Sequence, residues 1–467
     1  MAFPVFCDVI VKDSPLFSED KIIGHIKKGT KLKIIDEIAG KYEVKIETNE
    51  VSIIGFIDKN AVLKQVNYQG LTTLNFWQER AWHRIADPVN NLPWLNPEMD
   101  KEYRLDVLNY SYSNSWNNKW YNTDNGFRFL FGSISKINLY NIGEVKTSIP
   151  LNDENVFKFK YFKEETLEAQ RDYLEFSLFD KSFFDTGLYS FFTLNPSFNK
   201  QDIDLELGIG KSNSFFNYQF SIAFLDLYNN LTYRLSDGIE EEVYKQKPYA
   251  LKGKVEWFPC EDIGLQIFGA LTTNSEKKII YLEEDNNHSR KTKAGYIGMS
   301  LNLIGDNLNI MPYITYQYED EEIDTAVDDQ NNYDMQNGLT TFGLLFNKEL
   351  SVDWKIEADI KYILVQQKKD FLNEAFDYED RDLLSRIVFN KKHSKKLTSD
   401  YGFIFSHRKT DEHSAFNFEA DNYRLILGAE YKYTKNTYAN IGISFDLDRN
   451  DDESVYDGGK LQLISIW

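Results

Sequence analysis

The residues in this sequence with the widest catalytic chemistry are its histidines. They are His25, His83, His288, His393, His407 and His413. None lies in the spacing of a zinc-binding motif. His407, His413, Ser414 and Asn417 fall in one expected outer loop, where a hydrolytic site and a group of solvated side chains are the two interpretations. Because no hydrolase motif surrounds them, we expect no enzymatic activity.

Oxygen-rich stretches offer a second chemistry, because Ca²⁺ and Mg²⁺ prefer several oxygen ligands. One expected outer loop carries Glu319, Asp320, Glu321, Glu322, Asp324, Asp328 and Asp329. Another stretch has oxygen side chains at alternate positions, with Asp446 still in a strand, followed by Asp448, Asn450 and Asp452. This spacing lacks the glycine of an EF-hand loop. The last three residues are candidate ligands for Ca²⁺ or Mg²⁺ bridging lipopolysaccharide, and a solvated acidic loop is the alternative; no other cofactor is expected.

Composition limits the partners and the fold class. The formal net charge of the 467-residue chain is −20, so no nucleic-acid partner is expected, because phosphate binding needs a basic surface. The chain has 29 Tyr, 34 Phe and 8 Trp, although its mean hydropathy is only −0.49. A transmembrane barrel combines these properties, since lipid-facing and lumen-facing residues alternate and aromatic girdles flank the apolar band. A soluble all-β protein rich in aromatic residues is the alternative.

From about residue 101 to the end, apolar and polar residues alternate with a period of two, which is the signature of β-strands. The clearest cases are residues 203–210, 353–364 and 423–433, and we count about 18 such segments. Aromatic residues often stand at the ends of the apolar faces, as interfacial girdles do. The opposite faces carry charges expected to line a lumen and set its selectivity: Arg128, Lys252, Lys254, Glu256, Asp353, Glu357, Asp359, Arg424, Glu430 and Lys432. These charges are equally able to bridge a closed lumen.

The expected connections alternate between short and long. The short ones are 211–216, 259–262, 304–307, 348–351 and 434–437. The long ones are 227–247, 274–293, 318–336, 365–381, 408–421 and 448–458. Outer-membrane barrels have short periplasmic turns and longer extracellular loops. The sequence therefore predicts a transmembrane antiparallel β-barrel of about 16–18 strands over residues 101–467.

Residues 1–66 form a separate unit of short apolar stretches divided by turn residues, which predicts a small β-barrel. Ser14-Pro15, Ile23-Gly24, Lys28-Gly29-Thr30, Tyr42-Glu43-Val44 and Gly55-Phe56-Ile57 resemble the bacterial SH3 family. Phe56 stands where members of that family commonly have Trp. The resemblance covers about one seventh of the chain and implies a module that binds peptidoglycan, a peptide or a protein, without catalysis.

Residues 67–100 are expected to connect the two units. Leu74, Trp77, Ala81 and Ile85 recur at helical spacing, and Pro88 would end that helix. A helix packed between the two domains and a helix on the membrane surface are the two interpretations. Pro93 and Pro97 then mark an extended linker.

The C-terminal residues resemble the signal that the barrel-assembly machinery recognises. The chain ends in a predicted strand with Leu461, Leu463 and a terminal aromatic residue, Trp467. Ser465 departs from the alternation, and Phe is commoner than Trp at the last position. With an even number of strands and a periplasmic C-terminus, the SH3-like unit would also lie in the periplasm.

The two cysteines are Cys7 in the SH3-like unit and Cys260 in an expected periplasmic turn. A disulfide between them and two unpaired thiols are the alternatives, since the periplasm permits disulfides. Met1 to Pro4 do not resemble a secretory signal, so a leader removed from the natural precursor is expected.

These patterns predict a porin-like channel for small hydrophilic solutes in the outer membrane of a Gram-negative-type bacterium. The expected partners are lipid, lipopolysaccharide, the barrel-assembly machinery and peptidoglycan or a periplasmic protein, with a homo-oligomer also possible. The alternative is a structural anchor with a closed lumen, in which the barrel holds the SH3-like unit within a larger envelope complex.

Overall fold

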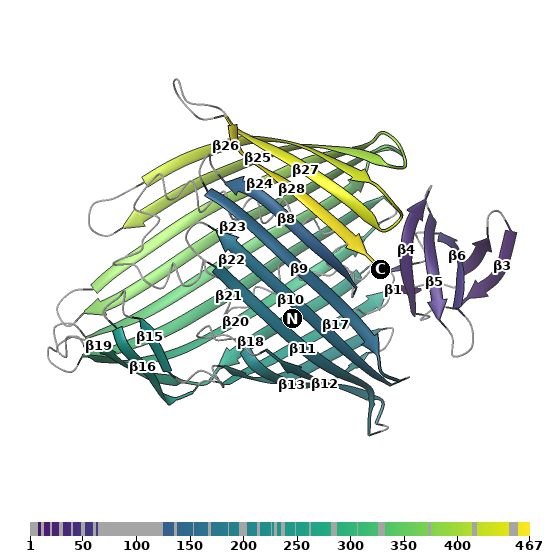
Figure 1. Ribbon diagram of the computed structural model, residues 1–467. Coiled ribbons are helices and arrows are strands. Elements are labelled where there is room, and N and C mark those ends of the chain that lie inside the picture. The colour runs from purple at the N-terminus through teal and green to yellow at the C-terminus, as the bar shows by residue number, and fades with distance from the viewer. Residues whose placement is uncertain are drawn as a thin grey trace.

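The computed structural model describes most of residues 8–63 and 125–467. Residues 1–7 and 64–124 lie outside the described part, as do several connections, among them 196–202, 282–286, 326–331, 413–417 and 448–455. All described elements are β-strands, arranged as a small sheet and a large closed barrel (Figure 1). Within the described ranges, no helix is long and apolar enough to cross a membrane.

Eighteen of the described strands form the closed antiparallel barrel, which confirms the predicted antiparallel barrel of about 16–18 strands. Neighbours in the ring are hydrogen-bonded, and the last strand pairs with the first to close it. The strands are β8 (Gly126–Ile134), β9 (Asn138–Pro150), β10 (Asn155–Thr166), β11 (Gln170–Phe183), β12 (Leu188–Leu194), β13 (Ile203–Ser212), β14 (Phe216–Leu225), β17 (Tyr249–Cys260), β18 (Ile263–Thr272), β20 (His288–Ile304), β21 (Leu308–Thr325), β22 (Tyr333–Glu349), β23 (Trp354–Phe371), β24 (Ala375–Lys392), β25 (Leu397–Glu412), β26 (Phe418–Lys432), β27 (Thr437–Asp446) and β28 (Tyr456–Ile466).

One end of the barrel carries the tight connections that the sequence predicts. The predicted turns 211–216, 259–262, 304–307, 348–351 and 434–437 all join consecutive strands there. The chain also ends at this side, beyond β28 (Figure 1). We call it the short-turn end.

The prediction of long outer loops is largely wrong, because strands continue through most of those residues. β15 (Leu231–Arg234), β16 (Ile239–Gln246) and β19 (Ser275–Tyr281) pair in the order β15–β16–β19 and then with β20. We call these three strands the rim extension; they lie at the end opposite the short turns (Figure 1). β20 to β26 also reach into the expected loops, and β27 ends at Asp446 as predicted.

The outer surface of the barrel is a band of exposed apolar side chains. Phe220, Leu251, Ile297 and Ile441 are each more than half exposed, at 53%, 57%, 57% and 52%. An apolar surface of this extent would be unstable in water and matches a lipid-facing band. Aromatic pairs stand toward the two ends of the band: Phe127 and Trp467, Trp354 and Tyr401, Tyr431 and Tyr433 at the short-turn end, and Tyr316 and Tyr318, Phe405 and Tyr423 at the other.

The N-terminal strands form one antiparallel sheet. They are β1 (Asp8–Ile10), β2 (Ser14–Ser18), β3 (Lys21–Ile26), β4 (Lys31–Ile38), β5 (Lys41–Glu47), β6 (Ser52–Asp58) and β7 (Val62–Leu63), in the order β3–β2–β6–β5–β4–β1–β7. The expected small closed barrel is not found, because β3 and β7 do not pair among the described residues. β2 meets β6 through the single pair Phe17 and Phe56, which leaves the β3–β2 hairpin weakly joined to the rest.

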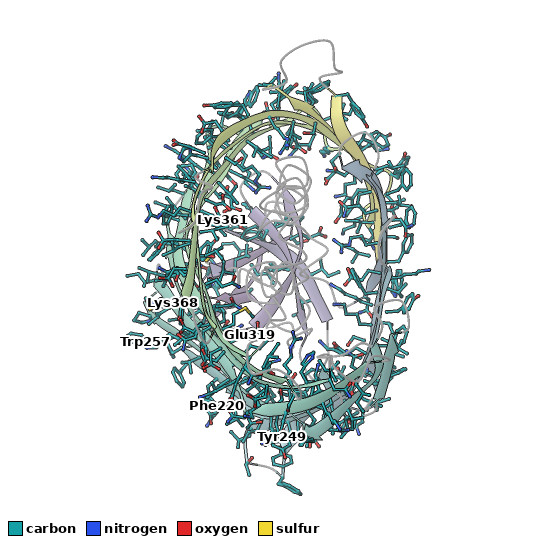
Figure 2. All side chains as sticks on the ribbon, turned by 90° about the vertical axis from the view of Figure 1, so that its left-hand side faces the viewer. Phe220, Tyr249, Trp257, Glu319, Lys361 and Lys368 are labelled. Carbon is teal, nitrogen blue, oxygen red and sulfur yellow. The ribbon has the colours of Figure 1, made fainter. Side chains whose placement is uncertain are left out.

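The N-terminal sheet lies at the short-turn end of the barrel. Figure 1 shows it beside the C-terminus, and Figure 2 shows it beyond the far mouth in a view along the barrel. Lys435, in the turn between β26 and β27, forms an ion pair with Glu43 of β5, with 3.1 Å between Nζ and Oε2. The predicted helix around Leu74 to Ile85 lies outside the described residues, as does the start of the barrel region before residue 125.

Candidate functional site

The candidate site is the inner wall of the barrel, because the chemistry-bearing side chains of the strands face inward. Within the apolar band, one face of the barrel strands is mostly apolar and exposed. The other face is mostly buried and carries many polar and charged residues together with an apolar cluster of Leu384, Val388, Ile404 and Ile426. Figure 2 shows Glu319 and Lys361 on the inner side of the wall and Trp257 on its outer side. The alternation therefore separates a lipid-facing surface from a charged wall.

Nine of the ten predicted lumen residues lie on this inward face. Arg128, Glu357, Asp359 and Arg424 are buried, and Lys252, Lys254, Glu256, Glu430 and Lys432 are partly buried. Asp353 differs, because it is an exposed turn residue directly before β23. Its backbone carbonyl accepts a hydrogen bond from the backbone N–H of Lys392, which extends the pairing of β23 with β24 by one residue.

The first charged cluster centres on Glu144 of β9. Its Oε2 lies 2.9 Å from Nη2 of Arg128 on β8, and its Oε1 lies 3.5 Å from Nζ of Lys160 on β10 and 3.7 Å from Nζ of Lys146. Glu144, Lys146 and Lys160 are missing from the predicted set. The alternation in β9 is weak because Asn141, Gly143 and Thr147 interrupt its lipid-facing side.

The second cluster joins β13, β14 and β17. Glu206 is fully buried, accepts a hydrogen bond from Ser221 Oγ at 2.5 Å and forms an ion pair with Lys252 Nζ at 3.1 Å. Ser221 and Lys252 are direct cross-strand partners, which places both beside the carboxylate. The alternation in residues 203–210 predicts that Glu206 faces inward, although Glu206 is not among the predicted lumen residues.

Further ion pairs follow the strands that carry the predicted residues. Lys254 pairs with Glu256 at 2.7 Å on β17, and Gln266 donates a second hydrogen bond to Glu256. On β23, Lys355 pairs with Glu357 at 2.9 Å and Lys361 with Asp359 at 3.1 Å. Neighbouring inward residues thus neutralise one another, so that the wall carries both signs of charge at short intervals.

Two buried arginines lie at one level of the wall on β24 and β26. The sequence alone does not predict that they would be close. Arg386 of β24 and Arg424 of β26 are both buried and both stand opposite Ile404 of β25 in the strand register. Asp359 is the cross-strand partner of Arg386, and Asp446 is the partner of Arg424. The register therefore brings two acidic and two basic residues to one level of the wall.

Inward aromatic rings lie over glycines of the neighbouring strand. A Cβ atom at Gly343 of β22 would overlap the ring of Tyr313 on β21, and one at Gly298 of β20 would overlap the ring of Phe268 on β18. Glycine permits this close approach because it has no side chain. The rings are thereby held flat against the wall.

Most of the predicted metal ligands and the cysteines of the predicted disulfide lie outside the described part or within a strand. No group of three or more His, Cys, Asp or Glu side chains is placed there to hold a metal ion. The candidate ligands Asp448, Asn450 and Asp452 lie outside the described part. Glu319 to Asp324 belong to β21 and not to a loop, because the pairing with β20 and β22 continues through them. Cys7 also lies outside the described part, so the proposed disulfide with Cys260 stays a prediction.

His407 lies in β25 rather than in the expected loop. Its Nδ1 is 2.7 Å from Asp421 Oδ1 on β26, on the outward face beyond Phe405 and Tyr423. His413, Ser414 and Asn417 lie outside the described residues, so the hydrolytic interpretation gains no geometry.

The strands beyond the apolar band carry outward ion pairs. Lys245 of β16 and Glu276 of β19 are 2.6 Å apart, and Lys291 of β20 lies 2.8 Å from Glu322 of β21. The hydrogen bond from Lys245 lowers the pKa of Glu276, and the hydrogen bond to Glu322 raises the pKa of Lys291. Both shifts favour the charged forms that hold neighbouring strands together.

Comparisons with solved structures find matches at low sequence identity and low TM-score. No family model matches the chain, and no curated protein matches it. OmpTdeltaL8, an outer membrane protein of Vibrio cholerae, is 9% identical with a TM-score of 0.35, over 73% of this chain and 97% of that one. CdiB from Acinetobacter baumannii is 10% identical with a TM-score of 0.39, over 73% of this chain and 60% of that one.

A third similar structure is Wzi of Escherichia coli, described as an outer membrane protein involved in group 1 capsule assembly and a carbohydrate-binding β-barrel. It is 9% identical with a TM-score of 0.37, over 74% of this chain and 85% of that one. At these identities and TM-scores the likenesses assign no function. The candidate site therefore rests on the chain's own geometry, a closed barrel with an apolar outer band and a charged inner wall.

Proposed function

We propose that this protein is an outer-membrane barrel of a Gram-negative-type bacterium that forms a channel for small hydrophilic solutes. The observation that carries the proposal is a closed ring of strands with a band of exposed apolar side chains on its outside and buried ion pairs on its inward face. Closed barrels satisfy every backbone hydrogen bond in lipid, and those of 16–18 strands enclose an aqueous path. Outer-membrane lipid and lipopolysaccharide would contact the band, and the barrel-assembly machinery would recognise the strand ending at Trp467.

The proposed transport is diffusion without chemical conversion. Partly exposed inward charges of both signs, such as Lys254 and Glu256, would replace part of a solute's hydration as it passes. Because the pairs neutralise one another locally, we expect weak selectivity between cations and anions, and we propose no enzymatic activity.

The N-terminal sheet would lie in the periplasm under this proposal. It lies at the same end as the short turns and the C-terminus, and short turns are periplasmic in outer-membrane barrels. Its SH3-like character and its binding to peptidoglycan or to a periplasmic protein are proposals that rest on the sequence resemblance.

A structural anchor is the second candidate. The burial of the inner wall and the ion pair between Glu43 and Lys435 favour it, because a simple channel needs neither. In this case the barrel would hold the N-terminal sheet at the membrane within a larger envelope complex.

Single-channel conductance in planar bilayers separates the two candidates. We expect discrete current steps from the full-length protein or from a variant that lacks residues 1–100. Steps in both would support the channel with the sheet as a tether, and steps only after deletion would show that the N-terminal region obstructs the path. Silence from both, with the barrel folded by circular dichroism, would overturn the channel and favour the anchor.

A further inference from the structure

The connection between β24 and β25 concentrates positive charge at the short-turn end of the barrel. Residues 391–396 read Lys-Lys-His-Ser-Lys-Lys, so four lysines stand together in a chain whose formal net charge is −20. The backbone N–H of Lys392 donates to the carbonyl of Asp353, and that of Lys432 donates to the carbonyl of Lys396. The short turns on either side therefore flank this one. We call residues 391–396 the basic turn.

The lysines of the basic turn are not neutralised by the protein in the way that lysines of the inner wall are. There, Lys355 lies beside Glu357 and Lys361 beside Asp359. Among the described residues, no carboxylate forms an ion pair with any lysine of the basic turn. The positive charge of the turn is therefore left for an anion from outside the barrel wall.

The outward face beside the basic turn carries an aromatic pair at the edge of the apolar band. Trp354, Lys391 and Ser399 stand in one row of cross-strand partners. Lys391 Nζ lies 5.1 Å from the centroid of the Trp354 ring, and that ring lies 6.4 Å from the ring of Tyr401. Tryptophan, tyrosine and lysine gather where lipid headgroups meet the hydrocarbon of a bilayer. The basic turn thus lies at the headgroup level of the membrane.

Hydrogen-bonding groups connect the turn to this outward face. His393 Nε2 is 2.7 Å from Ser399 Oγ, and Ser399 Oγ donates to Tyr401 Oη at 3.2 Å. Hydroxyl and ammonium groups both donate hydrogen bonds to phosphate oxygens, and the bonds from an ammonium group are the stronger because of its charge. The cluster offers both kinds of donor at one place, which is the combination that binds a phosphate diester.

We propose that the basic turn and the adjoining face of Trp354, Ser399 and Tyr401 bind the phosphate headgroup of an anionic phospholipid. Lysine clusters next to a membrane span attract anionic lipids. The acyl chains would lie against Phe389 and Phe403, which are 39% and 41% exposed on the same outward face. Under the proposed orientation this end faces the periplasm, so the ligand is a phospholipid and not lipopolysaccharide. The inference rests on the proposed membrane placement of the barrel and not on an open lumen.

Photo-cross-linking of the unmodified full-length protein tests the site. The protein would be placed in phosphatidylcholine vesicles that contain phosphatidylglycerol with a diazirine in its headgroup. Mass spectrometry should find the label concentrated within residues 389–403, and excess phosphatidylglycerol should reduce it more than excess phosphatidylcholine does. Equal labelling of the turns at 211–216 and 304–307, or no labelling, would overturn the proposal. Loss of the label on adding water-soluble glycerol phosphate at the concentration of the probe would show a free-phosphate site and overturn the lipid assignment.

Charge removal provides a second measurement. The triple variant Lys391→Gln, Lys395→Gln and Lys396→Gln should be labelled about tenfold less within residues 389–403. The matched control replaces Lys278, Lys293 and Lys368 by glutamine, which removes the same charge from exposed positions toward the opposite end. There, Lys293 and Lys368 stand opposite Asp320 and Asp377 in the strand register, so the control should be labelled like the unmodified protein. Equal labelling of the two variants would overturn the site.

Flotation of the vesicles separates this inference from the proposed function. Protein that does not float with the vesicles would contradict the membrane placement itself. Protein that floats and is not labelled within residues 389–403 would overturn only the lipid site. Neither readout depends on conductance, so an inactive channel leaves the test intact.

Discussion

At the scale of single residues, the inner wall carries buried ion pairs that matter to stability mainly because neither partner can be removed without cost. A buried pair contributes little net stability, because desolvation offsets the attraction between the charges. Removing one partner costs about 3–5 kcal/mol, because it leaves the other charge buried and uncompensated. Glu144 is a sensitive position of this kind, since Arg128, Lys146 and Lys160 all lie within 4 Å of its carboxylate.

Glu144→Gln should therefore make the wall more basic and the barrel less stable. We expect the reversal potential in a KCl gradient to shift toward anion selectivity and the free energy of unfolding in urea to fall by about 3 kcal/mol. Glu276→Gln is the matched control, because Glu276 lies on the rim extension outside the ring, and it should leave the reversal potential unchanged. The interpretation fails if both variants shift the potential equally.

The contact between Tyr313 and Gly343 supports a second prediction at this scale. Gly343→Ala should displace the ring and lower the free energy of unfolding by about 1–3 kcal/mol, as overpacking does. Gly143→Ala should be nearly neutral, because no atom lies within 4 Å of the added Cβ. The loss at Gly343 should shrink when Tyr313 is also replaced by alanine. An equal loss in both backgrounds would show that the ring is not the cause.

At the scale of elements, the rim extension is a hydrogen-bonded sheet beyond the apolar band, and ion pairs on the outward face add to the strand pairing there. Lys245 and Glu276 link β16 to β19, and Lys291 and Glu322 link β20 to β21, all beyond the apolar band. Exposed pairs of this kind are individually weak and depend on pH and salt. The rim extension should therefore open before the rest of the barrel.

Acidification should loosen β19. The pKa of Glu276 lies below its ordinary value of 4.5 in the folded protein, so its contribution is present above that value and is lost as the pH falls through the lowered pKa. A nitroxide attached at K278C should become more mobile between about pH 5 and pH 3. With Glu276→Gln the label should be mobile already at neutral pH and show no further change in that range. Identical pH profiles for the two proteins would contradict the assignment.

At the scale of the whole molecule, an ion pair between described residues links the N-terminal sheet to the short-turn end of the barrel. Glu43 and Lys435 are 392 residues apart in sequence, yet they lie 3.1 Å apart across the two structures. The pair is partly exposed, so it contributes less than about 1 kcal/mol. The pair therefore contributes to the orientation of the sheet but little to the strength of its attachment.

A charge reversal measures that contribution. Lys435→Glu should increase the rate at which a protease releases the sheet by up to about fivefold. The double variant Glu43→Lys with Lys435→Glu should restore the original rate, because the pair is rebuilt with its signs exchanged. If the double variant is cleaved as fast as the single one, the contact does not hold the sheet in place.

The period of two by itself determined the fold class, the inward face of most strands and the positions of the tight turns. Leu205 and Glu206, or Leu425 and Arg424, must face opposite sides of a strand, because successive side chains do. The extension of the strands beyond the apolar band could not be predicted in this way. Beyond the apolar band both faces of β21 are polar, so Glu319 to Asp324 show no alternation and resemble a loop.

Only the tertiary structure decided which charges meet. Glu206 and Lys252 are 46 positions apart, and their contact depends on β14 pairing with both β13 and β17, although β15 and β16 lie between β14 and β17 in the sequence. The open N-terminal sheet has a similar origin. Short apolar stretches predict strands, but closure requires a pairing between β3 and β7 that no local pattern encodes. Local alternation determines which way a side chain points, whereas long-range register determines what it touches.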